Sequence, residues 1–327
     1  MTAAEPGHST VPVIAGVDLG GTKIQAVVLR NEEVVGSARV LTPQTGDPGD
    51  VIDAIVETIR TSLEAARATE PDLGGIGIGT PGEVDAKAGA VLLAANVPGF
   101  SERVELGRLV SSQLGNANVT VGNDVNVGVL GEYERGAGRP YENLLGVWSG
   151  TGVGGGLIIE GQLYDGRGAA GEFGHLVVKP GGLHCSCGRR GCVEAYAGRV
   201  SMERRARQLV KRGQKTDLFH IMEKHERTRL SSGVFARALE QGDKMAKKLI
   251  AEAAWALGIG MASAQNLLDL EAIIVGGGLG DRLGQPFVDQ IVEQMTPHLF
   301  AQEPPVVLGT ELRDLSGAVG AAVLAGG

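Results

Sequence analysis

Short apolar runs that end in glycine turns divide this chain. Residues 13–17 precede a turn at 18–23, and residues 24–29 follow it, which predicts two antiparallel strands joined by a tight turn. The same layout returns at residues 144–148, 149–156 and 157–159. The sequence therefore predicts two copies of an α/β unit, each led by a β-hairpin.

Apolar residues at helical spacing separate further short strands. In residues 50–68, Val51, Ile55 and Ile59 lie on one predicted helical face. The alternation of helices with short apolar strands indicates an α/β fold, and 327 residues exceed what one core commonly serves, so we expect two domains. Other predicted helices span residues 104–114, 125–135, 200–211, 217–225, 231–240, 244–267, 287–299 and 317–324, and other predicted strands span 34–41, 75–79, 119–121, 271–275 and 306–308.

The charge balance excludes some classes of partner. The formal net charge is -8, and the chain has no basic block of the kind that binds a phosphate backbone, so we expect no nucleic-acid partner. The cationic run at residues 204–215 is typical of a solvated helix face. No apolar stretch approaches the roughly 20 residues of a membrane span. Residues 1–12 resemble a short disordered tail rather than a signal peptide, and we expect a cytoplasmic protein without a membrane partner.

All three cysteines of the chain, Cys185, Cys187 and Cys192, lie within eight positions. Thiolate sulfur with neutral imidazole is the preferred donor set of a closed zinc site. Incidental buried thiols are the plain alternative, and a redox pair would need the two-residue spacer that Cys-x-Cys lacks. His175 can return from another element as the fourth ligand, whereas His184 adjoins Cys185, so we favour His175. Free thiols on a metal fit a reducing compartment.

The glycine turns are candidate phosphate sites. Successive backbone N–H groups in such a turn form a concavity that binds anions. Lys23 adds a positive charge, Thr22 and Thr151 add hydroxyls, and Asp18 could hold Mg²⁺ through water. An ordinary tight hairpin is the alternative. Gly150, with Gly152 and Gly155, also satisfies the dinucleotide pattern G-x-G-x-x-G, but that pattern needs a helix next, and a strand is predicted here.

Asp124 is the candidate general base. It follows a predicted strand, at the end where α/β proteins place ligand-binding groups. A carboxylate at this place could accept the proton of a hydroxyl that attacks a phosphate. Asp124 also precedes a predicted helix, so it would equally make a good N-cap.

The run Glu-x-Gly-His followed by Cys-x-Cys-Gly-x-x-Gly-Cys-x-Glu, residues 172–194, resembles the ROK family of bacterial sugar kinases, repressors and open reading frames. The resemblance implies the duplicated actin/hexokinase-like (ribonuclease H-like) α/β fold, with two domains and a nucleotide in the cleft between them. It implies a small N-terminal domain over 1–122, on which a C-terminal helix at about 312–327 packs, and a large domain with the zinc knuckle over 123–311.

The resemblance also implies roles for single residues. Asn123 would contact the sugar and Asp124 would contact it and act as base. Asn96 would bind the sugar from a loop in which Phe100 stands where Trp is common, although a plain polar loop is a serious alternative. Zinc-bound His175 would touch the sugar, and Glu172 and Glu194 would bind its hydroxyls. The implied nucleotide-binding residues are Asp18, Gly20, Gly21, Thr22, Lys23, Gly150, Thr151, Gly152, Gly276, Gly277 and Gly278; the implied zinc ligands are His175, Cys185, Cys187 and Cys192.

These roles lead us to expect an ATP-dependent enzyme that phosphorylates glucose at the 6-hydroxyl, with Mg²⁺ and a structural Zn²⁺. The family resemblance further implies a homodimeric or homotetrameric assembly. Fructose, mannose or an N-acetylated amino sugar is the alternative substrate, and polyphosphate the alternative donor. Glu172 and Glu194 suit an unsubstituted sugar. A sugar-responsive regulator is the alternative of another class; too few residues precede the first strand for a helix-turn-helix domain.

Overall fold

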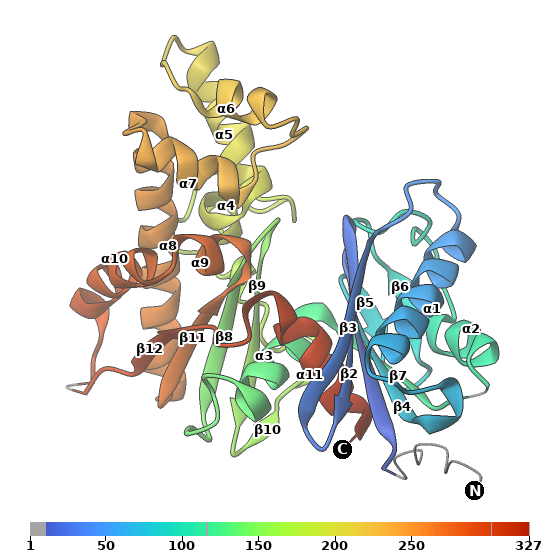
Figure 1. Cartoon of the computed structure of the whole chain (residues 1–327). Coiled ribbons are helices and arrows are strands. Elements are labelled where there is room, and N and C mark those ends of the chain that lie inside the picture. Colours follow the sequence, from blue (N-terminus) through green and yellow to red (C-terminus); the bar gives the residue numbers. More distant parts are fainter. Residues whose placement is uncertain (1–10, 116, 302, 327) are drawn as a thin grey trace, which may run out of the picture. The chain divides into compact units, whose positions relative to one another are not determined.

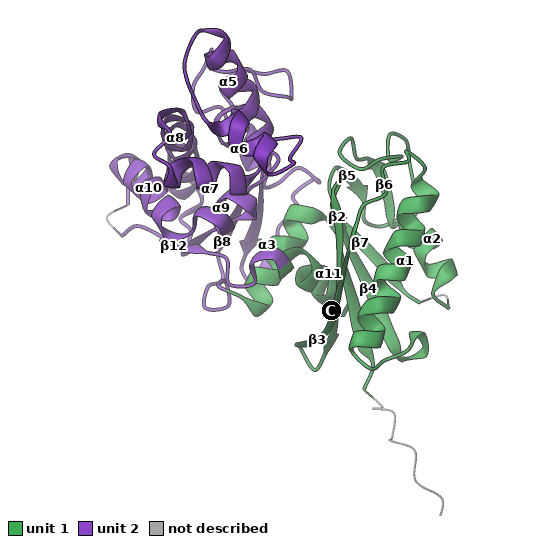
Figure 2. Ribbon diagram, turned by 45° about the horizontal axis from the view of Figure 1, so that its top comes forward, with its two compact units in different colours: residues 1–136, 315–327 green, residues 137–314 purple. Residues whose placement is uncertain are grey.

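The computed structural model describes residues 11–115, 117–301 and 303–326, in two compact units (Figures 1 and 2). Unit 1 comprises residues 1–136 and 315–327, and unit 2 comprises residues 137–314. Residues 1–10 of the predicted tail lie outside the described residues. The division falls after Gly136, so the helix that follows Asn123 groups with unit 1, whereas the sequence boundary of 122/123 assigns that helix to the other domain.

Unit 1 is built on a five-stranded sheet in the order β3-β2-β1-β4-β7. β1 pairs with β2 antiparallel and with β4 parallel, and β4 pairs with β7 parallel. The strands are β1 (Val13–Leu19), β2 (Lys23–Arg30), β3 (Glu33–Leu41), β4 (Leu73–Thr80) and β7 (Val119–Asn123); the helices packed on them are α1 (Pro48–Ala65), α2 (Leu106–Gln113), α3 (Asp124–Arg135) and α11 (Ser316–Gly326).

The C-terminal helix α11 lies directly on the sheet of unit 1. It packs on β1 and β4 and beside α3. A Cβ at Gly16 or Gly77 would overlap the backbone of α11, so only glycine permits this close approach. Alternate residues of the same strands, including Val17 and Ile78, join the apolar cluster with Ile55 of α1. Because side chains alternate between the faces of a strand, α1 and α11 cover opposite faces.

Unit 2 repeats this topology. Its sheet has the order β10-β9-β8-β11-β12, with an antiparallel hairpin β8-β9 and parallel neighbours β11 and β12. β8 therefore corresponds to β1, and β9 to β2, which confirms the predicted repeat. The glycine turn after β8 leads into a strand, so the dinucleotide reading is wrong. The strands are β8 (Leu144–Ser149), β9 (Val153–Ile159), β10 (Gln162–Leu163), β11 (Ala272–Gly276) and β12 (Val306–Gly309).

A helical layer completes unit 2. The long α8 packs against α10, and the apolar side chains of both join the core under β8 and β11. The sequence pattern found most of these helices, and it missed the short α4 and α9. The helices are α4 (Glu194–Ala197), α5 (Arg199–Lys211), α6 (Leu218–Lys224), α7 (Ser232–Glu240), α8 (Lys244–Leu268), α9 (Gly277–Leu283) and α10 (Gln285–Met295).

Short elements fill the connections, and the sequence pattern predicted none of them. They are β5 (Glu83–Asp85), β6 (Ala90–Leu93), and the 3-10 turns η1 (Glu70–Asp72), η2 (Phe173–His175), η3 (Thr296–His298) and η4 (Arg313–Leu315). Among the described residues, none of the helices combines the length and the apolar character that crossing a bilayer requires.

Candidate functional site

The first glycine turn joins β1 to β2 in unit 1. The amide of Gly20 donates to the carbonyl of Lys23 at 2.9 Å, and the Thr42 hydroxyl donates to the carbonyl of Gly20 at 2.6 Å. A Cβ at Gly21 would overlap the carbonyl oxygen of Asn96, so the turn packs against the backbone of the Asn96 loop. Two segments that lie far apart in the sequence, both candidates for ligand binding, are thus neighbours.

The loop around Asn96 is anchored by its aromatic residue. Phe100 is fully buried in the core of unit 1, and its carbonyl accepts from the amide of Ala94 at 2.9 Å. Asn96 itself is exposed. Phe100 therefore holds the loop from within the core while Asn96 is presented at the surface.

The end of β7 places Asn123 and Asp124 at the start of α3. Asn123, not Asp124, is the N-cap: its side-chain oxygen accepts from the amides of Val125 at 3.0 Å and Asn126 at 3.3 Å. The expectation that Asp124 would cap the helix is wrong, because α3 begins one residue earlier than predicted. The capping by Asn123 leaves Asp124 as the first helical residue, and its carboxylate accepts from the amide of Val125 at 2.9 Å.

The carboxyl group of Asp124, in unit 1, has a strongly raised pKa. Desolvation, followed by repulsion from Asp18, raises its pKa to about 7, although the hydrogen bond from Val125 acts in the opposite direction. Asp18 in turn lies against the start of α11, where a Cβ at Gly317 would come within 2.9 Å of its carboxyl carbon. A carboxylate that titrates near neutrality is suited to accept a proton.

In unit 2, His175 and the three cysteines form one cluster. Their ligand atoms all lie within 4.8 Å of one another. Cys187 Sγ lies 3.8 Å from Cys192 Sγ, and Cys185 Sγ lies 3.8 Å from His175 Nδ1. Zn–S bonds of 2.3 Å place two ligands of a tetrahedral ion about 3.8 Å apart, so the donor set fits zinc in both chemistry and size. His184 lies outside the cluster and hydrogen-bonds to Arg190.

The zinc knuckle, the segment of residues 185–192 that carries the three cysteines, is shaped by backbone hydrogen bonds and glycines. The amide of Cys185 donates to the carbonyl of Arg189 at 2.9 Å. Gly191 has φ of +83°, and a Cβ there would overlap the carbonyl of Lys179, so no other residue fits. The Arg189 side chain donates to the sulfur of Cys187 at 3.5 Å and lowers the pKa of that thiol to about 6, which favours the thiolate that binds metals.

The knuckle holds the two flanking glutamates in different ways. Glu172 is exposed, and its carboxylate lies 3.8 Å from Nε2 of His175, whereas Nδ1 of the same ring lies 3.8 Å from Cys185 Sγ. Glu194 begins α4, accepting from the Ser186 hydroxyl at 2.6 Å and from the amide of Val153 at 3.1 Å. The carboxylate of Glu194 therefore connects the knuckle to the second glycine turn.

The glycine turns of unit 2 lie against one another. The amide of Gly150 donates to the carbonyl of Gly152 at 2.9 Å, and a Cβ at Gly152 would overlap the Glu194 carboxylate. Gly277, with φ of +78°, would place a Cβ 2.9 Å from the backbone of Ser149. Residues 276–278 are a strand-to-helix turn from β11 into α9. The structure thus brings residues 149–152, 276–278 and Glu194 together within unit 2.

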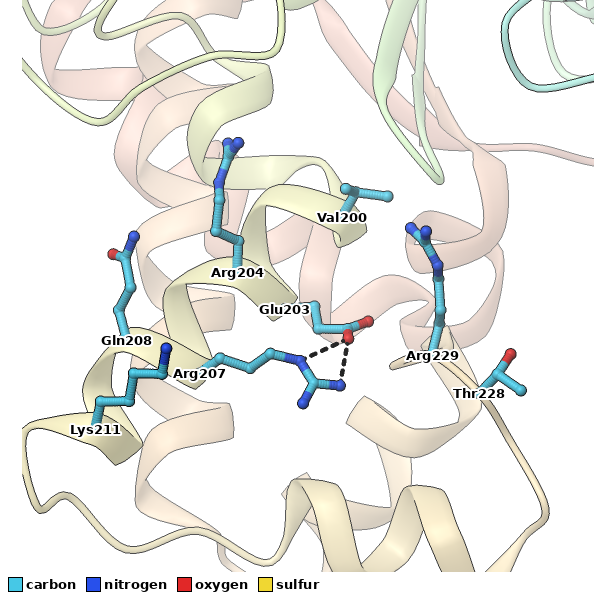
Figure 3. A pocket seen from close by; sticks show the side chains of 8 residues that line it. All are labelled: Val200, Glu203, Arg204, Arg207, Gln208, Lys211, Thr228 and Arg229. Atoms are coloured by element: carbon cyan, nitrogen blue, oxygen red, sulfur yellow. Dashed lines mark hydrogen bonds and ion pairs between the residues drawn. The ribbon is translucent and has the colours of Figure 1, made fainter.

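The outer face of α5 carries a basic hollow of about 460 Å³ (Figure 3). Arg207 pairs with Glu203 at 2.7 Å, and Arg204 donates to the carbonyl of His184 at 2.8 Å. Arg204, Arg207 and Lys211 are exposed, which confirms the predicted solvated face. The side chains that line the hollow are Val200, Glu203, Arg204, Arg207, Gln208, Lys211, Thr228 and Arg229.

Sequence reasoning missed two polar residues of these sites. Ser186 holds Glu194, and Arg199 donates to the Thr151 hydroxyl at 3.2 Å. Ser186 stands inside the cysteine run, and its place there was a usable signal. Arg199 gave no local signal, because only the folded chain brings it to the glycine turns.

Comparison with known proteins decides the family. The ROK family model matches residues 14–327. The chain belongs to the ROK family. A glucokinase of Streptomyces coelicolor is 34% identical over 95% of this chain and 96% of its own length, and an N-acetylgalactosamine kinase of a Shewanella species is 31% identical over 95% and 96%.

A solved structure of a ROK family glucokinase from Streptomyces griseus, in complex with glucose and AMPPNP, superposes with a TM-score of 0.81. It is 34% identical and covers 96% of this chain and 99% of its own. The duplicated actin- and hexokinase-like fold that the ROK resemblance implied is thereby confirmed.

Proposed function

We propose that this ROK protein is a sugar kinase that transfers the γ-phosphoryl group of Mg·ATP to the 6-hydroxyl of glucose. The observation that carries the proposal is Asp124, whose pKa is raised to about 7 at the end of β7. The similarity to glucokinases over nearly the whole chain supports both the reaction and the sugar.

Asp124 is the proposed base. Its ionised carboxylate would accept the proton of the sugar hydroxyl as that oxygen attacks phosphorus, the role of the catalytic aspartate in phosphoryl transfer to hydroxyls. Burial beside Asp18 makes the carboxylate a stronger proton acceptor than an exposed aspartate, at the expense of requiring a pH near or above 7 for ionisation.

The glycine turns are the proposed phosphate cradles. Gly20, Gly21, Thr22 and Lys23 would serve in unit 1, and Gly150, Thr151 and Gly152 in unit 2, with residues 276–278 beside the adenosine. Asp18 would hold Mg²⁺ through water, and that ion supplies charge neutralisation on the phosphates when it is bound.

Zinc has a structural role in this proposal. Three thiolates and one imidazole leave no open coordination position for chemistry. His175 would be oriented so that Nε2 faces the sugar, and the knuckle would hold Glu194 through Ser186. The proposed sugar contacts are Asn96, Asn123, Asp124, Glu172, His175 and Glu194.

Glucose is the preferred substrate because carboxylates such as Glu172 and Glu194 suit free hydroxyls. The relative that acts on N-acetylgalactosamine favours one alternative, a kinase for an N-acetylated amino sugar. Fructose and mannose share most of the same hydroxyls, and polyphosphate is the alternative donor.

The test is ADP release from Mg·ATP with glucose, run beside fructose, mannose and two N-acetylated amino sugars on zinc-loaded protein. The expected result is turnover on glucose above all other sugars, with a large loss of that turnover in Asp124→Asn. Preference for an N-acetylated sugar would overturn the glucose assignment alone. If no sugar were phosphorylated with either ATP or polyphosphate, the kinase proposal would be wrong and a sugar-responsive regulator would take its place.

A further inference from the structure

Arg199, the first residue of α5, lies where three segments of unit 2 meet. Its amide donates to the carbonyl of Gly150 at 3.1 Å, and its guanidinium donates to the Thr151 hydroxyl at 3.2 Å. A Cβ at Gly278 would lie 3.8 Å from the guanidinium carbon. Arg199 therefore hydrogen-bonds to the turn at 150–152 and lies beside the turn at 276–278.

One donor of the Arg199 side chain is unused within the part of the chain that the structure describes. Its Nε is buried and has no hydrogen-bond partner among the residues that the structure describes. Within those residues no carboxylate forms an ion pair with it, and desolvation lowers the pKa of the guanidinium. A cation that loses water without gaining an anion is costly, so an anion from outside the chain would complete this site.

The carboxylate that packs against the 149–152 turn is already engaged. Glu194 lies against Gly152 and Gly198, and its two oxygens accept from Ser186 and from the amide of Val153. The first amides of α5 are also taken, since those of Arg199 and Val200 donate to the carbonyls of Gly150 and Thr151. The guanidinium, rather than the helix terminus, is the group left to bind an anion.

We propose that Arg199 binds a phosphate group of the nucleotide donor and ties it to the glycine turns at 150–152 and 276–278. The proposal rests on the proposed function in one respect, that these turns hold the nucleotide. A guanidinium suits this task because its planar fork donates two parallel hydrogen bonds to a phosphate. Thr151 would orient the fork through its hydroxyl.

A purely structural role is the rival explanation, because the bond to Thr151 could simply brace the turn. The two roles differ in how they depend on the phosphates of the ligand. A phosphate contact weakens binding of ATP and ADP and spares adenosine, whereas a brace weakens all three alike or lowers the stability of the fold.

The experiment measures binding of Mg·ATP, Mg·ADP, AMP and adenosine by calorimetry, without sugar, to the wild type and to Arg199→Met and Arg199→Lys. Arg205→Met is the matched control, since Arg205 lies on the same helix and its buried Nε likewise has no partner among the described residues. A lost charged contact of about 1.5–3 kcal/mol corresponds to a roughly 10- to 150-fold weaker ATP affinity in Arg199→Met. We expect Arg199→Lys to fall between, and adenosine binding and the control to stay within about twofold of the wild type.

Equal losses for ATP and adenosine, unchanged ATP affinity, or an equal loss in Arg205→Met would each overturn the proposal, as would a wild type that binds no phosphate-bearing donor. If Arg199→Met does not fold, the comparison of Arg199→Lys with Arg205→Met, made with the same ligands, decides by the same criteria. The readout is separate from the sugar assay: a protein that binds ATP through Arg199 and phosphorylates no sugar would refute the proposed function only.

Discussion

The two hairpin turns occupy equivalent places in the two sheets, yet they acquire their chemistry differently. The turn of unit 1 carries Asp18 and Lys23 in its own sequence. The turn of unit 2, residues 149–152, contains no charged residue, and Glu194 and Arg199 approach it from the α4–α5 segment. The two units therefore share one topology, but the charged residues of the turn come from neighbouring sequence in unit 1 and from tertiary contacts in unit 2.

This difference separates two kinds of sensitivity. In unit 1 a single substitution on or near the turn changes the electrostatics directly. In unit 2 the turn depends on the knuckle, because the Ser186 hydroxyl donates to the Glu194 carboxylate, which in turn accepts from the amide of Val153. Damage to the knuckle should therefore reach the second turn and spare the first.

The largest expected effect comes from unit 1. Asp124→Asn should lower kcat by about 10²- to 10⁴-fold, because an amide cannot accept the proton. The affinity for Mg·ATP, measured without sugar, should stay near the wild-type value. A variant with near wild-type kcat would remove Asp124 from the chemistry and leave unit 1 without its proposed base.

The next effect concerns the knuckle of unit 2. His175→Ala should lose zinc, weaken sugar binding and lower the stability of the protein; a loss of about 3 kcal/mol corresponds to a Tm lower by roughly 6–12 °C. His184→Ala is the matched control, because His184 adjoins Cys185 but lies outside the cluster. Metal analysis and thermal unfolding check both variants. If His184→Ala lost zinc and His175→Ala kept it, His184 would be the ligand and the assignment of His175 would be wrong.

A pair of glycine substitutions compares the turns themselves. Gly21→Ala forces a Cβ into the backbone of Asn96, which cannot move aside, and should destabilise the protein by about 1–3 kcal/mol. Gly152→Ala meets the end of the Glu194 side chain, which can swing away, so the loss should be smaller. Urea unfolding measures the stabilities. Because Glu194 moves, Gly152→Ala should weaken sugar binding; equal stability losses and unchanged sugar affinity would contradict this account.

The smallest effect is a pH shift in unit 1. In the proposed mechanism turnover requires ionised Asp124, so kcat should rise with pH through about 7. Asp18→Asn removes the repulsion and should move this acid limb to lower pH, measured at saturating Mg·ATP.

Stability should change in the opposite sense, because the pKa of Asp124 is higher in the folded than in the unfolded state. The folded state then binds more protons between pH of about 4 and about 7, and the free energy of unfolding falls as pH rises through that window. Asp18→Asn should reduce this fall. An unmoved acid limb together with an unchanged stability profile would show that Asp18 does not act on Asp124.

The sequence by itself determined the features that depend on local physics. Apolar periodicity predicted the hairpin repeat and the main helices, and the donor chemistry of Cys185, Cys187 and Cys192 predicted a metal knuckle. Only the tertiary structure decided which histidine completes that cluster, that Asp18 raises the pKa of Asp124, and that Arg199 reaches both glycine turns. The reason is physical: spacing along the chain governs strands, turns and ligand types, whereas distances between remote side chains are set by how sheets and helices pack.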